Sequence, residues 1–519
     1  MTQRPRTLGE LKKTGYRPES VRSELRRNML KALREKGLSN AGGSNGSALF
    51  PGIVGFDKTV LPQIVNAVLA HHDFILLGLR GQAKTRIARA LVSFLDPEIP
   101  VLAGFPLNED PLAPISTGAK AHIAANGDAT EIRWLSRDER YREKLATPDV
   151  TIADLIGDID PIKAANKRLD YASEEVIHYG IIPRTNRGIF CINELPDLPA
   201  RIQVGLLNIM QERDLQIRGF PVRIPIDILM VYTANPEDYT NRGSIITPLK
   251  DRIDSQIMTH YPAKLADALT ITDQEAWTDR GDVRVHIPKY LRETIEEVAF
   301  QARKSEFLDQ SSGVSARLSI TLLENVVSSA ERRAVISGEK EVAVRPIDLQ
   351  AAVSAVTGKV ELVYEGEQEG ALSVARHLIG RATKTVFDRY LPDAYKSGSK
   401  EDPSFGPYKN VINYFAQGKN VEVSDEVPAA QLLASLRQVG GLEEIARKHL
   451  PIDRDNLDLA SAMEFVIEGL HQSRIVAKDE LEGHTRYRDM LGSMFEGMDE
   501  GKPPRPPRER GRSRDRDDE

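Results

Sequence analysis

Three short runs of apolar residues stand out in the first half of the chain, and polar residues follow each of them. The runs are Phe74–Leu77, Ile189–Ile192 and Ile228–Val231. Runs of this length, apolar at every position, are typical of strands buried on both faces of a parallel sheet. Segments with apolar residues at helical spacing separate the runs. The pattern therefore predicts an α/β domain built on a parallel sheet.

Helical spacing elsewhere predicts the elements around this sheet. Before it, the expected helices are Val21–Lys36 and Val60–Leu69, and Pro199–Met210 follows the second strand. Beyond residue 262 the chain becomes mainly helical, and residues 370–495 are expected to be mostly helical with polar breaks at 396–407 and 417–427. Long helical stretches are expected at Tyr290–Phe307 and Arg317–Ile336, and a shorter one at Pro346–Val356.

These patterns divide the chain into five parts. Residues 1–48 form an N-terminal helix and a flexible linker, and the folded core is expected to begin at residue 49. Residues 49–260 form the α/β domain, 261–360 a small helical domain, and 361–500 a helical C-terminal region. Residues 501–519 are rich in proline and charge, and are expected to be disordered.

Composition and charge narrow the class of protein. Net charge is −6 over 519 residues, so no overall basic field favours nucleic acid, and the arginines of the tail are interleaved with acids. No apolar run approaches the roughly 20 residues of a membrane span, and the N-terminus lacks the apolar core of a signal peptide. Cys191 is the single cysteine, which excludes an internal disulfide. We therefore expect a cytoplasmic protein.

The stretch after the first strand carries the clearest chemistry. It reads GLRGQAKT over residues 78–85, and a helical pattern follows, which is the order of a P-loop. Loop amides would surround phosphate oxygens, the lysine would reach the β- and γ-phosphates, and the threonine hydroxyl would bind Mg²⁺. The common pattern has glycine before the lysine; alanine there costs little if its φ is negative. The residues expected to bind nucleotide are Gly78, Gly81, Gln82, Ala83, Lys84 and Thr85.

Polar residues follow the other two strands as well. Asn193 and Glu194 come at the end of the second strand, and Asn235 follows the third. The carboxyl ends of parallel strands meet at one edge of a sheet, where open α/β folds bind their ligands. The three side chains and the P-loop are therefore expected to build one nucleotide site.

The same motifs resemble the AAA+ ATPases of the MoxR and magnesium-chelatase I-subunit clade over roughly residues 50–360. Besides the P-loop, the matching stretches are NRGIFCINELPDL (186–198), QVGLLNIMQERD (203–214), LQIRGFPVRIP (215–225), TANPEDY (233–239) and LKDRID (249–254). The resemblance implies a P-loop AAA+ core with a helical lid, an insertion at residues 151–180, ATP and Mg²⁺ as ligands, and a ring that is usually hexameric. Members of this clade commonly have alanine where Ala83 stands.

The resemblance also assigns roles to single residues. Glu194 matches the residue that polarises the attacking water, and Asn235 matches the polar residue called sensor 1. Arg252 matches the arginine finger, which acts on nucleotide in the adjacent subunit. Arg317 matches sensor 2, and Arg187 is a second candidate for reaching across the interface. A surface salt bridge is the alternative role for each arginine.

One position departs from the clade. Asn193 stands where relatives usually have aspartate, which accepts hydrogen bonds from Mg²⁺-bound water. A neutral amide oxygen makes weaker bonds than a carboxylate. We therefore expect Thr85 and Asn193 to serve the metal, with turnover slower than in an Asp-Glu relative.

The sequence favours a ring-forming ATPase that remodels a client protein, with a von Willebrand factor A domain protein as the partner that the resemblance implies. A motor subunit for metal insertion into a tetrapyrrole is the first alternative, although the region 370–495 exceeds a minimal motor of that kind. An ATP-binding scaffold that hydrolyses poorly is the second. The GAFTGA loop of enhancer-binding activators is absent from the sequence.

Overall fold

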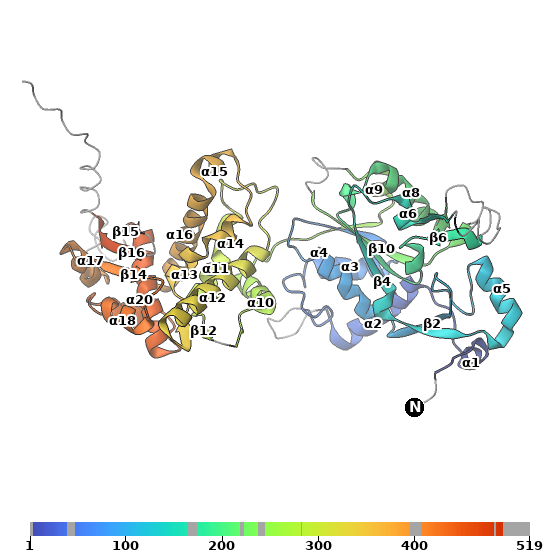
Figure 1. The fold of residues 1–519 in the computed structure, drawn as a ribbon, viewed down its shortest axis with the longest axis horizontal. Coiled ribbons are helices and arrows are strands. Elements are labelled where there is room, and N and C mark those ends of the chain that lie inside the picture. Colours follow the sequence, from blue (N-terminus) through green and yellow to red (C-terminus); the bar gives the residue numbers. More distant parts are fainter. Residues whose placement is uncertain are drawn as a thin grey trace, which may run out of the picture. The chain divides into compact units, whose positions relative to one another are not determined.

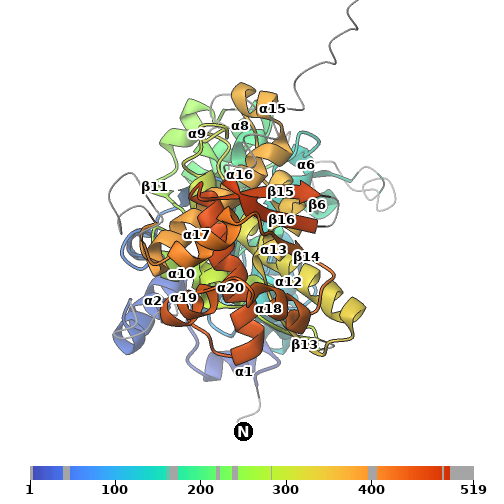
Figure 2. The same ribbon diagram turned by 90° about the vertical axis from the view of Figure 1, so that its left-hand side faces the viewer.

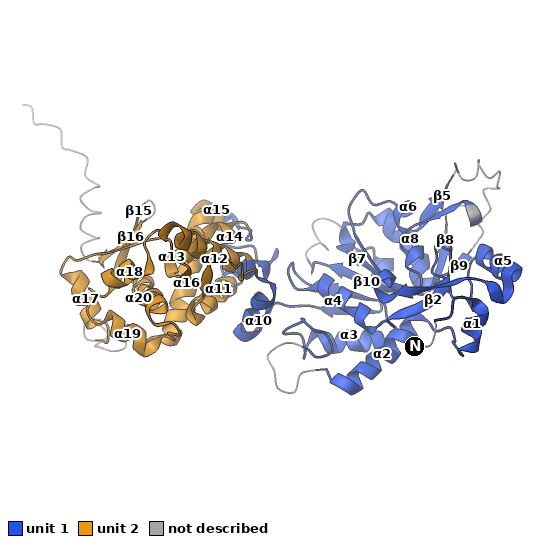
Figure 3. Cartoon of the chain, turned by 60° about the horizontal axis from the view of Figure 1, so that its bottom comes forward, with its two compact units in different colours: residues 1–276, 302–320, 359–365 blue, residues 277–301, 321–358, 366–519 orange. Residues whose placement is uncertain are grey.

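The computed structural model describes residues 4–38, 47–160, 162, 174–217, 223–236, 244–281, 283–394, 406–481 and 484–490. Two compact units are present (Figure 3). Unit 1 comprises residues 1–276, 302–320 and 359–365, and unit 2 comprises 277–301, 321–358 and 366–519. The predicted helical domain, 261–360, is thus divided between the two units.

A five-stranded parallel sheet forms the centre of unit 1, in the order β11-β1-β10-β7-β4. In register, Phe74 of β1 lies opposite Val231 of β10 and Ser255 of β11. The three apolar runs lie within the central strands, which confirms the predicted α/β class with a parallel sheet. The strands are β1 (Phe74–Leu77), β4 (Tyr141–Leu145), β7 (Gly188–Asn193), β10 (Ile228–Ala234) and β11 (Ser255–Met258).

Successive residues of these strands enter two separate cores. Phe74, Leu76 and Cys191 point to one face, which is covered by α2 (Val21–Lys36), α3 (Val60–Leu69) and α4 (Lys84–Ala90). Ile75, Leu77 and Phe190 point to the other, which is covered by α8 (Ala200–Glu212) and the insertion around α6 (Ile152–Leu155) (Figure 1). Burial on both faces explains why these strands carry no polar alternation.

The N-terminal segment belongs to unit 1, so the prediction that the folded core begins at residue 49 is wrong. Val21, Leu25 and Met29 of α2 are buried in the sheet's core. A buried ion pair adds to this attachment, because Arg140 makes two hydrogen bonds to Glu24, at 2.7 and 2.5 Å. Most of the predicted linker lies outside the described residues.

Smaller elements complete unit 1. The insertion contains α6 and an antiparallel pair of strands, and the predicted hairpin at 215–225 is present as a second pair, with its turn outside the described residues. These elements are α1 (Leu8–Lys13), β2 (Glu98–Leu102), α5 (Thr117–Asn126), β3 (Ile132–Ser136), β5 (Gly157–Ile159), β6 (Ile177–Tyr179), β8 (Asp214–Gln216), β9 (Arg223–Pro225), α9 (Thr247–Asp251) and α10 (Leu265–Glu275).

Unit 2 is built around α20 (Asp455–Gln472), whose residues from Asp458 to Leu470 are all buried. A helix buried on every side needs partners for its polar groups, and Glu464 is paired with Arg345 at 2.8 Å. Three strands of this unit pair into a sheet in the order β14-β16-β15, which lies among its helices (Figure 2). The other elements are β12 (Arg284–His286), α11 (Lys289–Ala302), α12 (Arg317–Ser337), β13 (Glu341–Ala343), α13 (Pro346–Ala351), α14 (Val353–Thr357), α15 (Tyr364–Glu369), α16 (Ala371–Tyr390), α17 (Lys409–Ala416), β14 (Val421–Ser424), α18 (Ala429–Leu436), α19 (Leu442–His449), β15 (Val476–Leu481) and β16 (His484–Asp489).

The C-terminal region is mostly helical as predicted, but its sheet was not foreseen. The stretch expected to be a polar break at 417–427 contains the strand β14. Val421 and Val423 alternate there with polar residues, which is the period of a half-buried strand. Within the described part of the chain, no helix combines the length and apolar character needed to cross a bilayer.

Candidate nucleotide site

The loop between β1 and α4 is shaped by two glycines. Gly81 has φ +76°, and a Cβ placed there would lie 2.1 Å from Ser315 Oγ. A Cβ on Gly78 would lie 1.9 Å from Thr259 Oγ1. Both positions therefore require glycine, for backbone conformation at the first and for close approach at both.

Gln82 anchors the loop to the sheet. Its side chain is buried, and Oε1 accepts a hydrogen bond of 2.7 Å from the Thr259 hydroxyl, just beyond β11. The backbone N–H of Gly78 donates to Ala234 O at 3.1 Å. These two bonds fix the loop against the ends of both strands that flank β1.

Ala83 does not meet the condition under which an alanine here costs little. It has φ 57° and ψ 16°, in the left-handed region, whereas that condition was a negative φ. A residue with a Cβ is disfavoured there by about 1–2 kcal/mol. The loop thus holds a strained residue directly before its lysine.

Lys84 and Asn235 meet at the mouth of the loop. Lys84 is buried, and Nζ donates to Asn235 Oδ1 at 2.7 Å, to Leu79 O at 3.2 Å and to Gly78 O. The structure therefore brings together the P-loop lysine and the predicted sensor residue, which are 151 positions apart in the chain.

The Asn193 side chain accepts hydrogen bonds from two threonine hydroxyls. The Thr85 hydroxyl donates to Asn193 Oδ1 at 3.2 Å, and the Thr233 hydroxyl donates to the same atom at 3.3 Å. Thr233 also accepts the backbone N–H of Glu194 at 3.1 Å, and Glu194 has a left-handed backbone with φ 54°. The two predicted metal residues are thus in contact at the carboxyl edge of the sheet.

Thr233 is a site residue that sequence reasoning missed. It is buried within β10, and it contacts both residues of the Asn-Glu pair at the end of β7. The signal was available, because Thr233 is the one hydroxyl-bearing aliphatic side chain in the apolar strand ILMVYTA.

The donor set fits Mg²⁺ and a phosphate chain. A hydroxyl, an amide oxygen and a following carboxylate are the hard oxygen ligands that Mg²⁺ prefers. Gly81 keeps the loop free of a side chain, and Lys84 supplies a positive charge at its mouth. These residues would hold a metal-nucleotide complex.

An apolar pocket adjoins the loop within unit 1. It is lined by Gly81, Gln82 and Ala83 on one side and by residues from before α3, after β11 and within α10 on the others. Val54, Phe56, Pro262 and Ile271 supply the apolar part of its lining. Its volume is only about 60 Å³, below the roughly 300 Å³ of typical ligand pockets, so it would have to widen to take a planar base.

Arg317 lies on the loop's side of unit 1. It is exposed and begins α12, two residues after Ser315, whose hydroxyl packs against Gly81. This placement sets Arg317 at the rim of the site.

Arg252 lies on the opposite edge of the sheet. It follows α9, and its guanidinium donates to Gln211 Oε1 at 2.9 and 2.7 Å. The strand β11 begins three residues later, opposite Phe74 at the start of β1. Arg252 therefore lies near the amino ends of the strands, whereas the P-loop follows their carboxyl ends.

Arg187 is held inside its own chain. It is buried, pairs with Asp110 at 3.0 Å, and donates to Pro100 O at 2.7 Å and to the Tyr16 hydroxyl at 2.8 Å. These contacts argue against its reaching into a neighbouring subunit.

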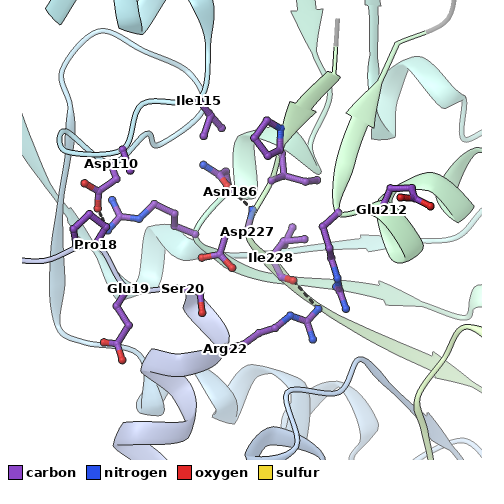
Figure 4. A pocket seen from close by; sticks show the side chains of 15 residues that line it. Pro18, Glu19, Ser20, Arg22, Asp110, Ile115, Asn186, Glu212, Asp227 and Ile228 are labelled. Carbon is purple, nitrogen blue, oxygen red and sulfur yellow. Dashed lines mark hydrogen bonds and ion pairs between the residues drawn. The ribbon is translucent and has the colours of Figure 1, made fainter.

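A cleft of about 500 Å³ lies beside Arg187 at the amino edge of the sheet (Figure 4). Arg22 crosses it to the Ile228 carbonyl at 3.0 Å, and Asp227 accepts the N–H of Val21 at 2.6 Å. Burial raises the pKa of Asp227 above its usual range. Glu212, the last residue of α8, and Arg213, which follows it, line the same cleft.

The single cysteine lies in β7 between the two cores. Cys191 is fully buried, and burial raises the pKa of its thiol to about 12. Its Sγ donates a long hydrogen bond of 3.6 Å to Asn193 Oδ1. A protonated, inaccessible thiol is structural.

Sequence comparison finds relatives among magnesium-chelatase subunits. No protein-family model matches the chain. Magnesium-chelatase subunit ChlI of Nostoc is 26% identical over 236 residues, covering 45% of this chain and 59% of that protein. Subunit ChlI-1 of Arabidopsis thaliana is 27% identical over 276 residues, covering 52% of this chain and 59% of that protein. The chain thus spans less than two thirds of these relatives, which confirm the resemblance predicted from its motifs.

Solved structures give weaker likenesses. A magnesium-chelatase BchI–BchD complex based on cryo-EM matches at 20% identity and a TM-score of 0.32, covering 61% of this chain and 97% of that chain. NtrX from Brucella abortus with ADP matches at 13% identity and a TM-score of 0.33, covering 60% of this chain and 56% of that chain. Scores this low carry no argument about function.

Proposed function

We propose that this chain, an AAA+ ATPase of the MoxR and magnesium-chelatase I-subunit clade, hydrolyses ATP in a ring and uses the energy to remodel a client protein. The observation that carries the proposal is the convergence of Lys84, Asn235, Thr85 and Asn193 at the carboxyl edge of one parallel sheet. Four polar side chains from three elements meet there, beside a loop that needs two glycines.

Each residue then has a task in the reaction. Lys84 neutralises charge on the β- and γ-phosphates, and Thr85 and Asn193 would hold Mg²⁺, which would supply electrostatic stabilisation of the phosphates. Glu194 polarises the attacking water. The apolar pocket beside Gln82 and Ala83, about 60 Å³ in volume, would widen to receive the adenine base.

Ring assembly follows from the position of Arg252 in this proposal. Its guanidinium lies at the edge of the sheet opposite the P-loop, so a second copy must present its nucleotide to it. A finger of this kind is worth roughly 10³–10⁵ in rate. Arg317, at the rim of the chain's own site, acts as sensor 2.

The client side of the proposal rests on the insertion and the hairpin. The hairpin pair β8–β9 follows α8 in the chain, and α6 of the insertion packs on α8, where Ile152 approaches Gly205. Nucleotide-dependent movement of α8 would shift both the hairpin and the insertion. A hexameric ring and a von Willebrand factor A domain partner are the assembly we propose from the resemblance.

The central experiment measures ATP binding and phosphate release by purified variants. Lys84→Ala should lose ATP binding, and Glu194→Gln should keep binding while losing hydrolysis. Unchanged phosphate release in both variants would refute the ATPase proposal.

Mixing two inactive variants tests the ring. Arg252→Ala keeps an intact P-loop, and Lys84→Ala keeps an intact finger, so a mixture should regain part of the activity at mixed interfaces. Activity that stays absent at every ratio, although the variants co-assemble, would exclude a trans role for Arg252.

A chelatase motor is the second candidate function, because the curated relatives are magnesium-chelatase subunits. Metal insertion into a tetrapyrrole, assayed with chelatase partner subunits, would favour it over the chaperone. A third candidate, an assembly scaffold, is favoured by Asn193. Nucleotide-dependent assembly without phosphate release would support that role.

A further inference from the structure

Unit 2 contains a cluster of possible metal ligands that the proposed ATPase does not use. His286 ends the strand β12, and Asp453 and Asp458 flank the start of α20. One ligand atom from each residue lies within 4.8 Å of the other two. The cluster joins segments more than 160 residues apart.

One buried polar atom in this cluster, Oδ1 of Asp458, has no hydrogen-bond partner among the described residues. The side chain of Asp458 is 0% exposed, and its other oxygen, Oδ2, faces His286 Nε2 at 3.2 Å. An unsatisfied buried polar group costs about 1–3 kcal/mol, so Oδ1 calls for an explanation.

We propose that these three residues bind one divalent transition-metal ion of the Zn²⁺ or Mn²⁺ class. Imidazole nitrogen and carboxylate oxygen together suit such ions, whereas Mg²⁺ and Ca²⁺ favour oxygen ligands alone. Ligands about 2.1 Å from a tetrahedral ion lie roughly 3.4 Å apart, which the 3.2 Å between Asp458 and His286 approaches. Asp453 is exposed and can close the remaining gap.

The backbone around Asp458 presents Asp453 to the site. Oδ2 of Asp458 accepts the N–H of Asp453 at 3.0 Å and that of Arg454 at 2.8 Å. These bonds fix the segment before α20 against the side chain of Asp458. A bound ion would fasten the first turn of the central helix of unit 2 to β12, with a fourth position left for water.

A simpler arrangement is an ion pair between protonated His286 and Asp458. That pair needs no contribution from Asp453, whereas the metal site does. The role of Asp453 in metal binding therefore separates the two, and its exposure means that a substitution there leaves the fold intact.

The experiment titrates the full-length protein, freed of metal with EDTA and without nucleotide, with ZnCl₂ and MnCl₂ by calorimetry. We expect one ion per chain for at least one metal, a dissociation constant at least tenfold weaker in Asp453→Asn, and no binding in His286→Gln. Asp455→Asn removes a neighbouring exposed carboxylate and should bind as the parent does. Circular dichroism checks that every variant is folded.

A further variant distinguishes metal binding at this site from metal binding at the nucleotide site. Thr85→Val alters the proposed Mg²⁺ ligand of unit 1 and should leave the titration unchanged. Stoichiometric binding that survives in Asp453→Asn, or no stoichiometric binding of either metal by the parent protein, would overturn the proposal.

Discussion

Restoring a carboxylate at position 193 should strengthen the coupling of hydrolysis to Mg²⁺. The Asn193 amide oxygen accepts three long hydrogen bonds, 3.2 Å from Thr85, 3.3 Å from Thr233 and 3.6 Å from the Cys191 thiol. Neutral bonds contribute about 0.5–1.5 kcal/mol, and bonds to a charged group about 1.5–3 kcal/mol. A carboxylate would therefore gain about 1 kcal/mol for each donor that it orients, including a metal-bound water. A gain of about 1 kcal/mol is roughly fivefold in an equilibrium constant.

The assay is steady-state phosphate release at saturating ATP, measured across a series of Mg²⁺ concentrations. Asn193→Asp should lower the half-saturating Mg²⁺ concentration about fivefold, and should raise the rate. Asn126→Asp, an exposed change on α5 with the same added charge, should change neither. If Asn193→Asp hydrolyses ATP no faster at any Mg²⁺ concentration, the reasoning about the amide is refuted.

Three further predictions concern unit 1. Ala83→Gly relieves the left-handed strain of about 1–2 kcal/mol and loses about 0.4–1 kcal/mol to the freer unfolded chain, so chemical denaturation should show equal or slightly greater stability. Cys191 should resist iodoacetamide at pH 8 until the protein unfolds, because its buried thiol has a pKa of about 12; rapid labelling of the native protein would contradict this. Glu24→Ala leaves the Arg140 guanidinium buried without its carboxylate, and should cost about 3–5 kcal/mol of unfolding free energy, whereas Glu19→Ala at an exposed pair should cost under about 1 kcal/mol.

The central strands could be predicted because burial on both faces makes them continuous apolar runs, which are easy to recognise. Phe74–Leu77 was placed at its exact bounds, and the other two apolar runs lie inside β7 and β10. The edge strand β4 escaped prediction for the opposite reason. Its sequence, YREKL, carries three charged residues in a row, because an edge strand needs less apolar surface and tolerates charge.

Local patterns also fail where tertiary context decides. The spacing of Val21, Leu25 and Met29 predicted the helix α2, but it could not show that this helix covers one face of the sheet. The left-handed conformation of Ala83 is imposed by the loop around it, since alanine alone favours the opposite sign of φ. Such constraints are absent from any single stretch of sequence.

The residues of the candidate site fall into two groups by how they could be found. The residues that directly follow apolar strands could be found from sequence, because the carboxyl ends of parallel strands lie together at one edge of the sheet. Arg252 could be matched only by resemblance, and its role as a finger stays a prediction. It follows α9 at the amino edge, where Gln211 orients it, and β1 carries the chain from that edge to the P-loop at the other. In the proposed ring, each chain would therefore offer its P-loop and its arginine on opposite edges of one sheet, so that a finger would reach a phosphate only in a second copy.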